Sequence, residues 1–159
     1  MNVTRTLLAF SKKLLASLTA ATFLALPFAG LAPSVAFAAG GDSNITHYSV
    51  WGGTSVDLGS GANVQSGLVG SNGKVSGSSH NTLTDGIQSG GDTNLSSYFS
   101  TGGSILSNGK IALDSHSSVG GDLDAGSTIA TSSGTTVSGS QIEHDGTSAS
   151  PLPTLPSVT

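Results

Sequence analysis

Valine, isoleucine and leucine recur along residues 56–142 in a regular cycle. The intervals within a cycle are 6, 8 and then 4 or 5 residues, and mostly Gly, Ser, Thr and Asn lie between the apolar positions. A flexible Ser/Gly linker has no reason to keep such a phase. The pattern therefore predicts a folded repeat, whose cycles start at Val69, Ile87, Ile105, Leu123 and Ile142.

Three apolar positions per short cycle, each flanked by turn residues, are typical of a parallel β-solenoid with three short strands per coil. One coil cannot bury its apolar residues alone, but coils stacked about 4.8 Å apart bury them in one column. We predict an all-β fold, a single-stranded parallel β-helix of about five coils of about 18–19 residues each, over residues 50–145. Residues 87–104 depart from the spacing. There we expect Leu95, Tyr98 and Phe99 to replace the missing apolar positions, with a bulge or a loop excursion.

Glycine-containing turns fall between the apolar positions. Ser71-Asn-Gly-Lys74 recurs 36 residues later as Ser107-Asn-Gly-Lys110, two cycles on. Asn-Gly favours turns because both residues tolerate positive φ. Glycine pairs at 90–91, 102–103 and 120–121 are expected at sharp corners.

Residues 1–38 have the features of a signal peptide. Three basic residues, Arg5, Lys12 and Lys13, precede a largely apolar segment over 14–32, and Ala36-Phe-Ala38 gives an A-x-A cleavage pattern. The alternative is a retained membrane anchor, since the apolar run approaches the spanning length. Cleavage predicts a secreted or cell-surface protein with no stable membrane span.

The two ends of the remaining chain differ in composition from the repeat. We expect residues 39–49 to lead into the solenoid or cap it. Residues 146–159 are rich in proline, which cannot continue a central strand, and they are expected to form an extended linker or tail. Either this segment ends in solvent, or the sequence is a fragment that lacks a C-terminal anchor or domain.

Charge and composition narrow the function. After residue 38 the chain has two lysines, nine acidic residues and no arginine, a formal net charge of −7. Nucleic-acid binding needs a basic footprint, so we expect no nucleic-acid partner. With no cysteine, disulfide scaffolds and thiolate zinc sites are excluded.

The histidines give no metal site. His80 and His116 have the same phase two coils apart, roughly 10 Å along the solenoid, which is too far to share one ion. We interpret both as surface or corner residues. His144, between Glu143 and Asp145, is interpreted as part of a solvated rim, because neighbouring strand residues point to opposite faces.

Calcium binding and catalysis are both disfavoured. Gly-Gly-Asp occurs at 40–42, 90–92 and 120–122, but Asp122 and Asp124 offer too few oxygen ligands for calcium, and corner glycines explain the motif. The acids do not gather at one phase, as carbohydrate cleavage would require. We predict no catalytic, cofactor-binding or metal-binding residues, and no enzymatic activity. The acidic residues that do not share one phase of the repeat are Asp57, Asp85, Asp92, Asp114 and Asp122.

An ice-binding face would need a regular threonine ladder. Thr82-Leu-Thr84 is one T-x-T unit, but four further threonines are expected to be out of register with it. The four are Thr128, Thr131, Thr135 and Thr136.

Three segments resemble the repeats of bactofilin-type, polymer-forming β-helix proteins and of related exported bacterial surface domains: residues 69–75, 104–113 and 119–129. The resemblance covers roughly residues 50–145. It implies a right-handed β-helix that polymerises end to end without a nucleotide and serves as a scaffold, with no catalytic residues to carry over. The export signal distinguishes this chain from cytoskeletal members and points to the envelope.

We therefore expect a non-catalytic, exported structural or adhesive β-helix module of the bacterial cell envelope, with self-polymerisation as a further expectation. Its partners would be other copies of itself, associated end to end, or an envelope polysaccharide. The alternative is an extracellular carbohydrate-binding or carbohydrate-cleaving β-helix protein.

Overall fold

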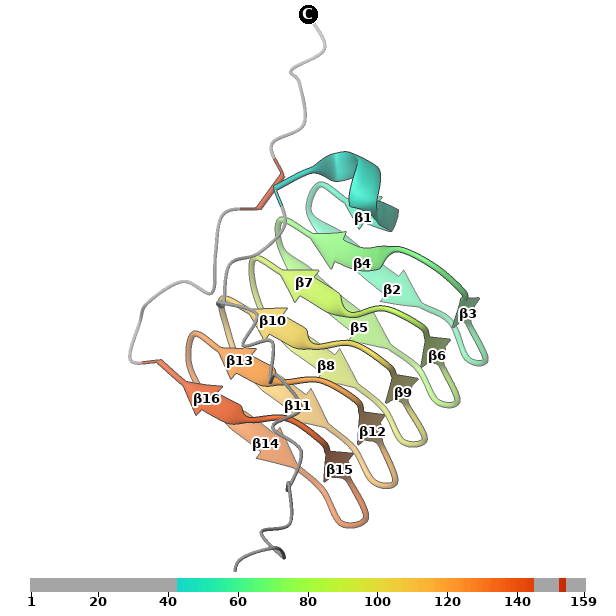
Figure 1. The fold of residues 1–159 in the computed structure, drawn as a ribbon, viewed down its shortest axis with the longest axis vertical. Helices are drawn as coiled ribbons and strands as arrows, with labels where there is room; N and C mark the ends of the chain where they lie inside the picture. Colours follow the sequence, from blue (N-terminus) through green and yellow to red (C-terminus); the bar gives the residue numbers. More distant parts are fainter. Residues whose placement is uncertain (1–42, 145–151, 154–159) are drawn as a thin grey trace, which may run out of the picture. The chain divides into compact units, whose positions relative to one another are not determined.

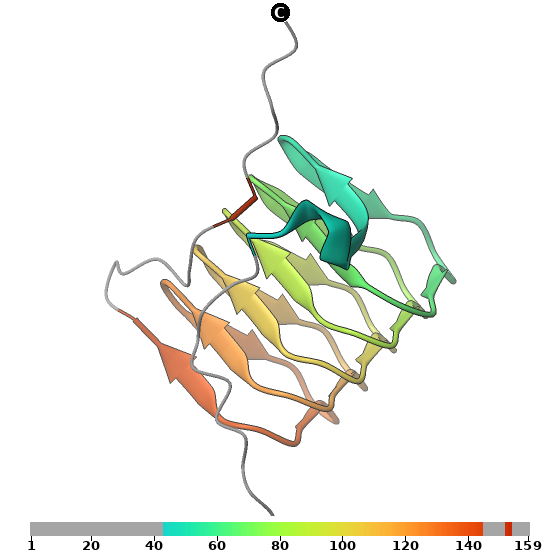
Figure 2. The same cartoon turned by 45° about the horizontal axis from the view of Figure 1, so that its top comes forward.

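The computed structural model describes residues 43–144 and 152–153. In this part of the chain, strands follow one another around three parallel sheets, and the coils stack in chain order from β1 to β16 (Figures 1 and 2). The prediction of an all-β, parallel β-solenoid with about five coils is confirmed. The proposed signal peptide (1–38), residues 39–42 of the lead-in, Asp145 and most of the tail lie outside the described residues.

Sheet A has six strands and begins beside a short 3-10 helix, η1 (Ile45–His47). The side chain of Asn44 caps this helix by accepting a hydrogen bond from the backbone N–H of Thr46 at 3.1 Å. The strands, in spatial order, are β1 (Tyr48–Gly52), β4 (Leu68–Ser71), β7 (Ile87–Ser89), β10 (Ile105–Ser107), β13 (Leu123–Ala125) and β16 (Gln141–Glu143).

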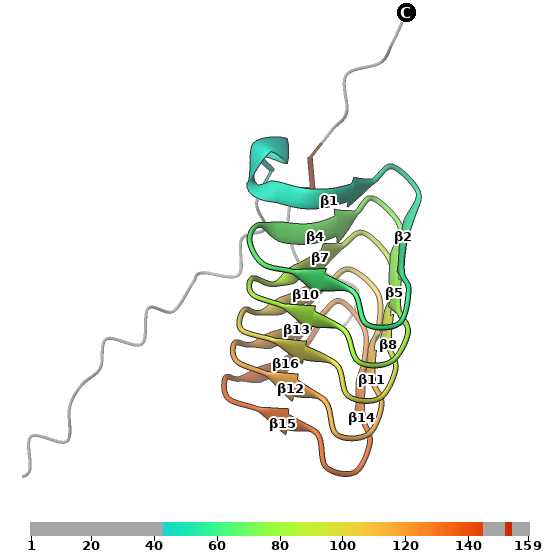
Figure 3. The ribbon, with the colours of Figure 1, turned by 90° about the vertical axis from the view of Figure 1, so that its right-hand side faces the viewer.

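Sheets B and C have five strands each, and Figure 3 shows the sheet B strands stacked along one side of the solenoid. Sheet B contains β2 (Ser55–Leu58), β5 (Lys74–Gly77), β8 (Thr93–Leu95), β11 (Ile111–Leu113) and β14 (Ile129–Thr131). Sheet C contains β3 (Asn63–Val64), β6 (Thr82–Leu83), β9 (Ser100–Thr101), β12 (Ser118–Val119) and β15 (Thr136–Val137).

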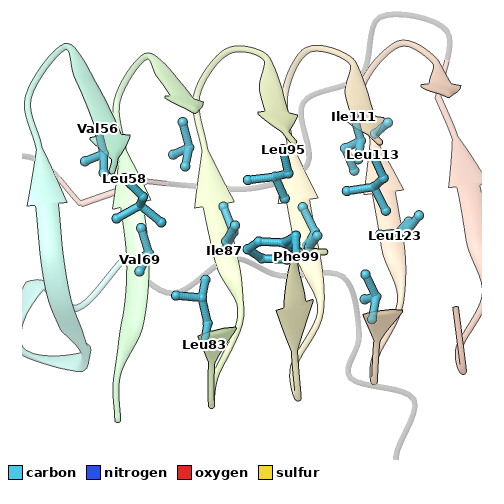
Figure 4. Packing of buried hydrophobic residues seen from close by; sticks show 14 residues of the cluster. Val56, Leu58, Val69, Leu83, Ile87, Leu95, Phe99, Ile111, Leu113 and Leu123 are labelled. Atoms are coloured by element: carbon cyan, nitrogen blue, oxygen red, sulfur yellow. The ribbon is translucent and has the colours of Figure 1, made fainter. Parts of the chain in front are cut away.

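The core is a column of aliphatic side chains that lie above one another in successive coils (Figure 4). In sheet A, Val69 pairs with Ile87, Ile87 with Ile105, and Ile105 with Leu123, and all four are 0% exposed. Burying a side chain of this size contributes about 1.5–3 kcal/mol. The regular spacing of the apolar residues along the sequence therefore reflects this buried column, which stabilises the fold.

The coil over residues 87–104 contains no bulge, which corrects the expectation from its irregular spacing. Thr93 pairs with Ile111, and Thr101 with Val119, in the regular parallel register. Both threonines are buried, and the hydroxyl of Thr93 lies 2.7 Å from that of Ser89. A β-branched side chain whose hydroxyl is hydrogen-bonded can replace an aliphatic one without a change in the backbone.

Of the three residues expected to fill the core in this coil, two are buried and one is exposed. Leu95 and Phe99 are buried in the core, as expected. Tyr98, by contrast, is 52% exposed. Its backbone has a positive φ of 61°, which turns its side chain outward at a corner.

The prediction that Ile142 starts the last cycle is wrong. Leu123 pairs with Gln141, whereas Ile142 pairs with Asp124 and is 40% exposed. The last cycle is therefore one residue shorter than predicted and has the same length as the cycles before it. No later coil packs on this strand within the described residues, so an apolar side chain at the inward register position is not required here.

The Asn-Gly turns are built differently from the prediction. Gly73 and Gly109 are not among the positive-φ residues. A Cβ on Gly73 would overlap the carbonyl oxygen of Thr54 in the preceding coil, and the backbone N–H of Gly73 donates to the hydroxyl of Ser71 at 3.0 Å. Glycine is needed here because stacked corners approach closely, not because of its φ.

Two residues of the proline-rich segment lie among the described residues. Pro153 is buried. Leu152 is half-buried, and its Cδ1 atom lies 2.7 Å from the place that a Cβ on Gly90 would occupy. Leu152 therefore contacts the solenoid. In the described part of the chain, no helix has the length and apolarity needed to cross a membrane.

Candidate functional site

A shallow groove of about 520 Å³ lies on the outer face of sheet B. It crosses the strands from β2 to β14, so it runs along the solenoid rather than around it. Its lining consists mainly of small polar and small apolar side chains, and its residues are Asp57, Ser76, Gly77, Ser78, Asn94, Leu95, Ser96, Ala112, Leu113, Asp114, Ala130, Thr131 and Ser132.

The register explains why sheet B has a groove and why the groove is polar. Ser76, Asn94 and Ala112 are consecutive partners in β5, β8 and β11, on the face opposite the core. Their short side chains leave space above the sheet. Hydroxyl and amide groups can both donate and accept hydrogen bonds, so this floor suits a polar, uncharged ligand.

Both lysines outside the first 38 residues lie on the same outer face. Lys74 and Lys110 directly precede Val75 and Ile111, whose side chains point into the core, and alternation turns the lysines outward. Asp92 lies between them in the stack, because it directly precedes Thr93, which pairs with both Val75 and Ile111. The face therefore carries charges of both signs and no excess of positive charge.

Three aromatic rings form a ladder at the corner between sheets B and C. The ring of Tyr98 stacks on that of His80 at 4.9 Å and on that of His116 at 5.1 Å, with an interplanar angle of 11° in both pairs. The three residues have φ values of 64°, 61° and 60° in chain order. We call His80, Tyr98 and His116 the corner ladder. It lies beside the groove, because each member follows a groove residue by two positions.

Glycine occupies the same corner in the first and last complete coils. Gly61 and Gly134 have φ values of 73° and 75°. Left-handed backbone costs a bulky residue about 1–2 kcal/mol, whereas glycine adopts it freely. Stacking contributes about 0.5–1.5 kcal/mol per aromatic pair, which offsets part of that cost.

The sequence showed two of the three ladder residues. The separation of His80 and His116 by 36 residues placed them in phase, and the two stacking steps agree with the expected distance of roughly 10 Å. Tyr98 was missed because it was assigned to the core. Its position midway between the two histidines along the chain was the signal that could have identified it.

Several of the dispersed aspartates link neighbouring coils. The carboxylate of Asp85 accepts a hydrogen bond from Gly67 N at 2.6 Å, and that of Asp122 from Ser140 N at 2.7 Å. Asp92 accepts likewise from Lys110 N at 3.0 Å. Donor and acceptor are one coil apart in each pair, so these side chains join adjacent coils at the corners.

His144, which we interpret as part of a solvated rim, is partly exposed and also contacts a buried carboxylate. Its Nε2 atom is 2.7 Å from Oδ1 of Asp124, and the two side chains are 35% and 3% exposed. Neither carboxylate oxygen of Asp124 accepts a regular hydrogen bond from the described residues. Glu143 accepts separately from Ile129 N at 2.5 Å. Asp122 and Asp124 are thus engaged by different parts of the last coil.

The outer face of sheet C carries an uncharged row of hydroxyl and amide side chains. The stacked residues are Asn63, Thr82, Ser100, Ser118 and Thr136. Thr136 is therefore in register with Thr82, which corrects the expectation that it is not. Serine separates the two threonines, so the row is a mixed hydroxyl ladder rather than a threonine ladder.

The outer face of sheet A is covered at its N-terminal end. Tyr48 and Trp51 form an edge-to-face pair at 4.6 Å, and a Cβ on Gly70 would overlap both rings. The hydroxyl of Tyr48 donates to Oε1 of Gln88 at 2.5 Å, and Gln88 is 1% exposed. This end of the face is packed rather than open, so we take the groove and the corner ladder as the candidate site.

Within residues 43–144 and 152–153, no three His, Cys, Asp or Glu side chains are grouped closely enough to hold a metal ion. Comparison of the chain with protein-family models, with curated proteins and with solved structures finds no match.

Proposed function

We propose that this chain is a non-catalytic structural module of the bacterial cell envelope that associates with further copies through the ends of its solenoid. The end at β14, β15 and β16 carries the proposal. Each of these strands is the last in its sheet and has a strand neighbour on one side only among the described residues. Edge strands of this kind are templates for pairing with another chain.

The side chains at this end support association. Ile129 and Val137 are only half-buried, and Ile142 is 40% exposed, whereas the aliphatic residues of the inner coils are almost completely buried. A further coil would remove this apolar surface from water. The strands also carry few of the charged residues with which proteins protect sheet edges.

The location in the envelope rests on the sequence of residues 1–38, which has the features of an export signal. The resemblance of residues 69–75, 104–113 and 119–129 to bactofilin-type repeats agrees with a polymer-forming scaffold. An acidic chain without arginine after residue 38 fits a structural role better than binding to nucleic acid.

The test uses backbone groups on the open edge of sheet B. In β14, the N–H of Ile129 points away from β11 and donates to Glu143, and alternation places the N–H of Thr131 on the same open edge. Thr131→Pro removes this donor without removing a hydrogen bond inside the solenoid. Ile142→Lys adds a charge beside the same end.

Light scattering and electron microscopy of the full chain over rising concentration should show oligomers or filaments. Both variants should shift the onset of assembly to at least tenfold higher concentration. Ser118→Lys, on an inner coil, is the matched control and should assemble normally. A wild-type chain that stays monomeric at the highest concentration would contradict the proposal, as would variants that assemble like the wild type.

A further inference from the structure

We infer that the sheet B groove and the corner ladder together form a binding site for an uncharged polysaccharide that lies along the solenoid. The groove reaches β14, but it lies on the outer face of sheet B, whereas association uses the free backbone edges of the end strands. The inference therefore does not depend on end-to-end association. It rests on three observations: the strain of the ladder, the lining of the groove, and the charges around it.

The ladder places exposed aromatic rings where the backbone favours glycine. Three consecutive coils carry a ring at positive φ, although Gly61 and Gly134 show that the same corner can be made without one. Strained residues that persist at a surface point to a function. Tyr98 is more than half exposed and combines an apolar ring with a hydroxyl, which suits a sugar with apolar C–H faces and polar edges.

The groove provides the polar half of the site. Ser78, Ser96 and Asp114 lie two residues before His80, Tyr98 and His116, so a line of polar side chains runs parallel to the ladder. With Ser76 and Asn94 in the floor, donors and acceptors face the same space. Carbohydrate hydroxyls need this combination.

The dimensions favour a polymer over a compact ligand. The groove crosses five strands, and four spacings of about 4.8 Å give a length of about 19 Å. The small side chains of Ala112 and Ala130 leave space above the sheet at the end near β14. A chain of several linked sugars can follow such a track from coil to coil.

The charges favour an uncharged ligand. The ionisable groups that line the groove are two carboxylates, Asp57 and Asp114. They would repel a polyanion, and Lys74 and Lys110 at the side of the same face oppose the attraction that the carboxylates would exert on a polycation. A polysaccharide without charged groups meets neither obstacle.

The test measures retention of the full chain on insoluble cellulose, chitin and xylan, with polygalacturonate as the anionic comparison. We expect binding to at least one of the three uncharged polymers and weaker binding to polygalacturonate. Tyr98→Gly removes the exposed ring but keeps a residue suited to positive φ. Ala112→Trp fills the groove from an outward position, and each variant should weaken binding at least tenfold.

Ser118→Trp is the matched control, because it places the same bulky side chain on the outer face of sheet C and should bind like the wild type. Circular dichroism checks that the variants fold, and if Tyr98→Gly does not fold, Ala112→Trp decides. Repeating the assay with Ile142→Lys separates glycan binding from end-to-end assembly. Absence of binding to all three uncharged polymers, unchanged binding of Ala112→Trp, equal loss in Ser118→Trp, or preference for polygalacturonate would each overturn the inference.

Discussion

Oδ1 of Asp124 lies 2.7 Å from Nε2 of His144, which joins a buried carboxylate in β13 to the residue that directly follows β16. Asp124 lies between Leu106 and Ile142 in the outer row of sheet A. A carboxylate in such an apolar row is costly unless it has a partner. The contact therefore holds the last strand of sheet A to the solenoid.

Replacing His144 should destabilise the chain because the buried carboxylate loses its partner. We expect His144→Ala to lower the free energy of unfolding by about 1–3 kcal/mol. Adding Asp124→Leu, which continues the apolar row, should restore most of the loss. Urea denaturation of the two single variants and the double variant measures the coupling. Additive effects of the two substitutions would contradict the pairing.

The core column predicts a contrast between two isoleucines. Ile105 is fully buried in β10, so Ile105→Ala should cost about 2–5 kcal/mol. Ile142 is 40% exposed, so Ile142→Ala should change stability by no more than about 0.5 kcal/mol. Thermal and chemical denaturation measure both values. Similar losses in the two variants would contradict the register that places Ile142 on the outer face of β16.

Two glycines should respond oppositely to alanine. Gly73→Ala places a methyl group against the carbonyl of Thr54 and should cost about 1–3 kcal/mol. No atom lies within 4 Å of a Cβ on Gly59, so Gly59→Ala should stabilise the chain by about 0.4–1 kcal/mol by restricting the unfolded state. The midpoint of urea denaturation distinguishes the two directions.

Removing one of the aspartates that join adjacent coils should lower stability locally. Asp122→Ala removes the acceptor for Ser140 N and should lower stability by about 0.5–1.5 kcal/mol. Amide hydrogen exchange at Ser140 should speed up more than exchange in the inner coils. Asp57→Ala is the comparison, because the Asp57 side chain is exposed in the groove. It should leave both measurements close to those of the wild type.

The apolar spacing was enough to predict the architecture because every coil of a solenoid places its inward side chains at equivalent positions. Each coil must supply inward residues at three places, so Val69, Ile87, Ile105 and Leu123 appear in phase. The spacing did not predict the positions at which a polar residue is buried in the core in place of an aliphatic one. Thr93 and Thr101 point into the core with hydrogen-bonded hydroxyls, and nothing in a hydropathy pattern separates them from outward threonines.

The candidate site was only partly visible in the sequence. His80 and His116 were recognised as equivalent positions, and their distance followed from the coil spacing. The groove was not predicted, because its shape depends on which short side chains share one face. Ser76, Asn94 and Ala112 belong to three successive coils and become neighbours only when the coils stack.

The sequence by itself determined the period, the parallel solenoid and the acidic, cysteine-free composition, because these depend on regular spacing and on counts of residues. Tertiary structure decided which residues face outward, which glycines are needed for close contact between coils, and that Tyr98 completes the corner ladder. These features depend on the backbone angle at each corner and on contacts between residues one coil apart. The spacing of residues along the sequence specifies neither the backbone angle at a corner nor the contacts between coils.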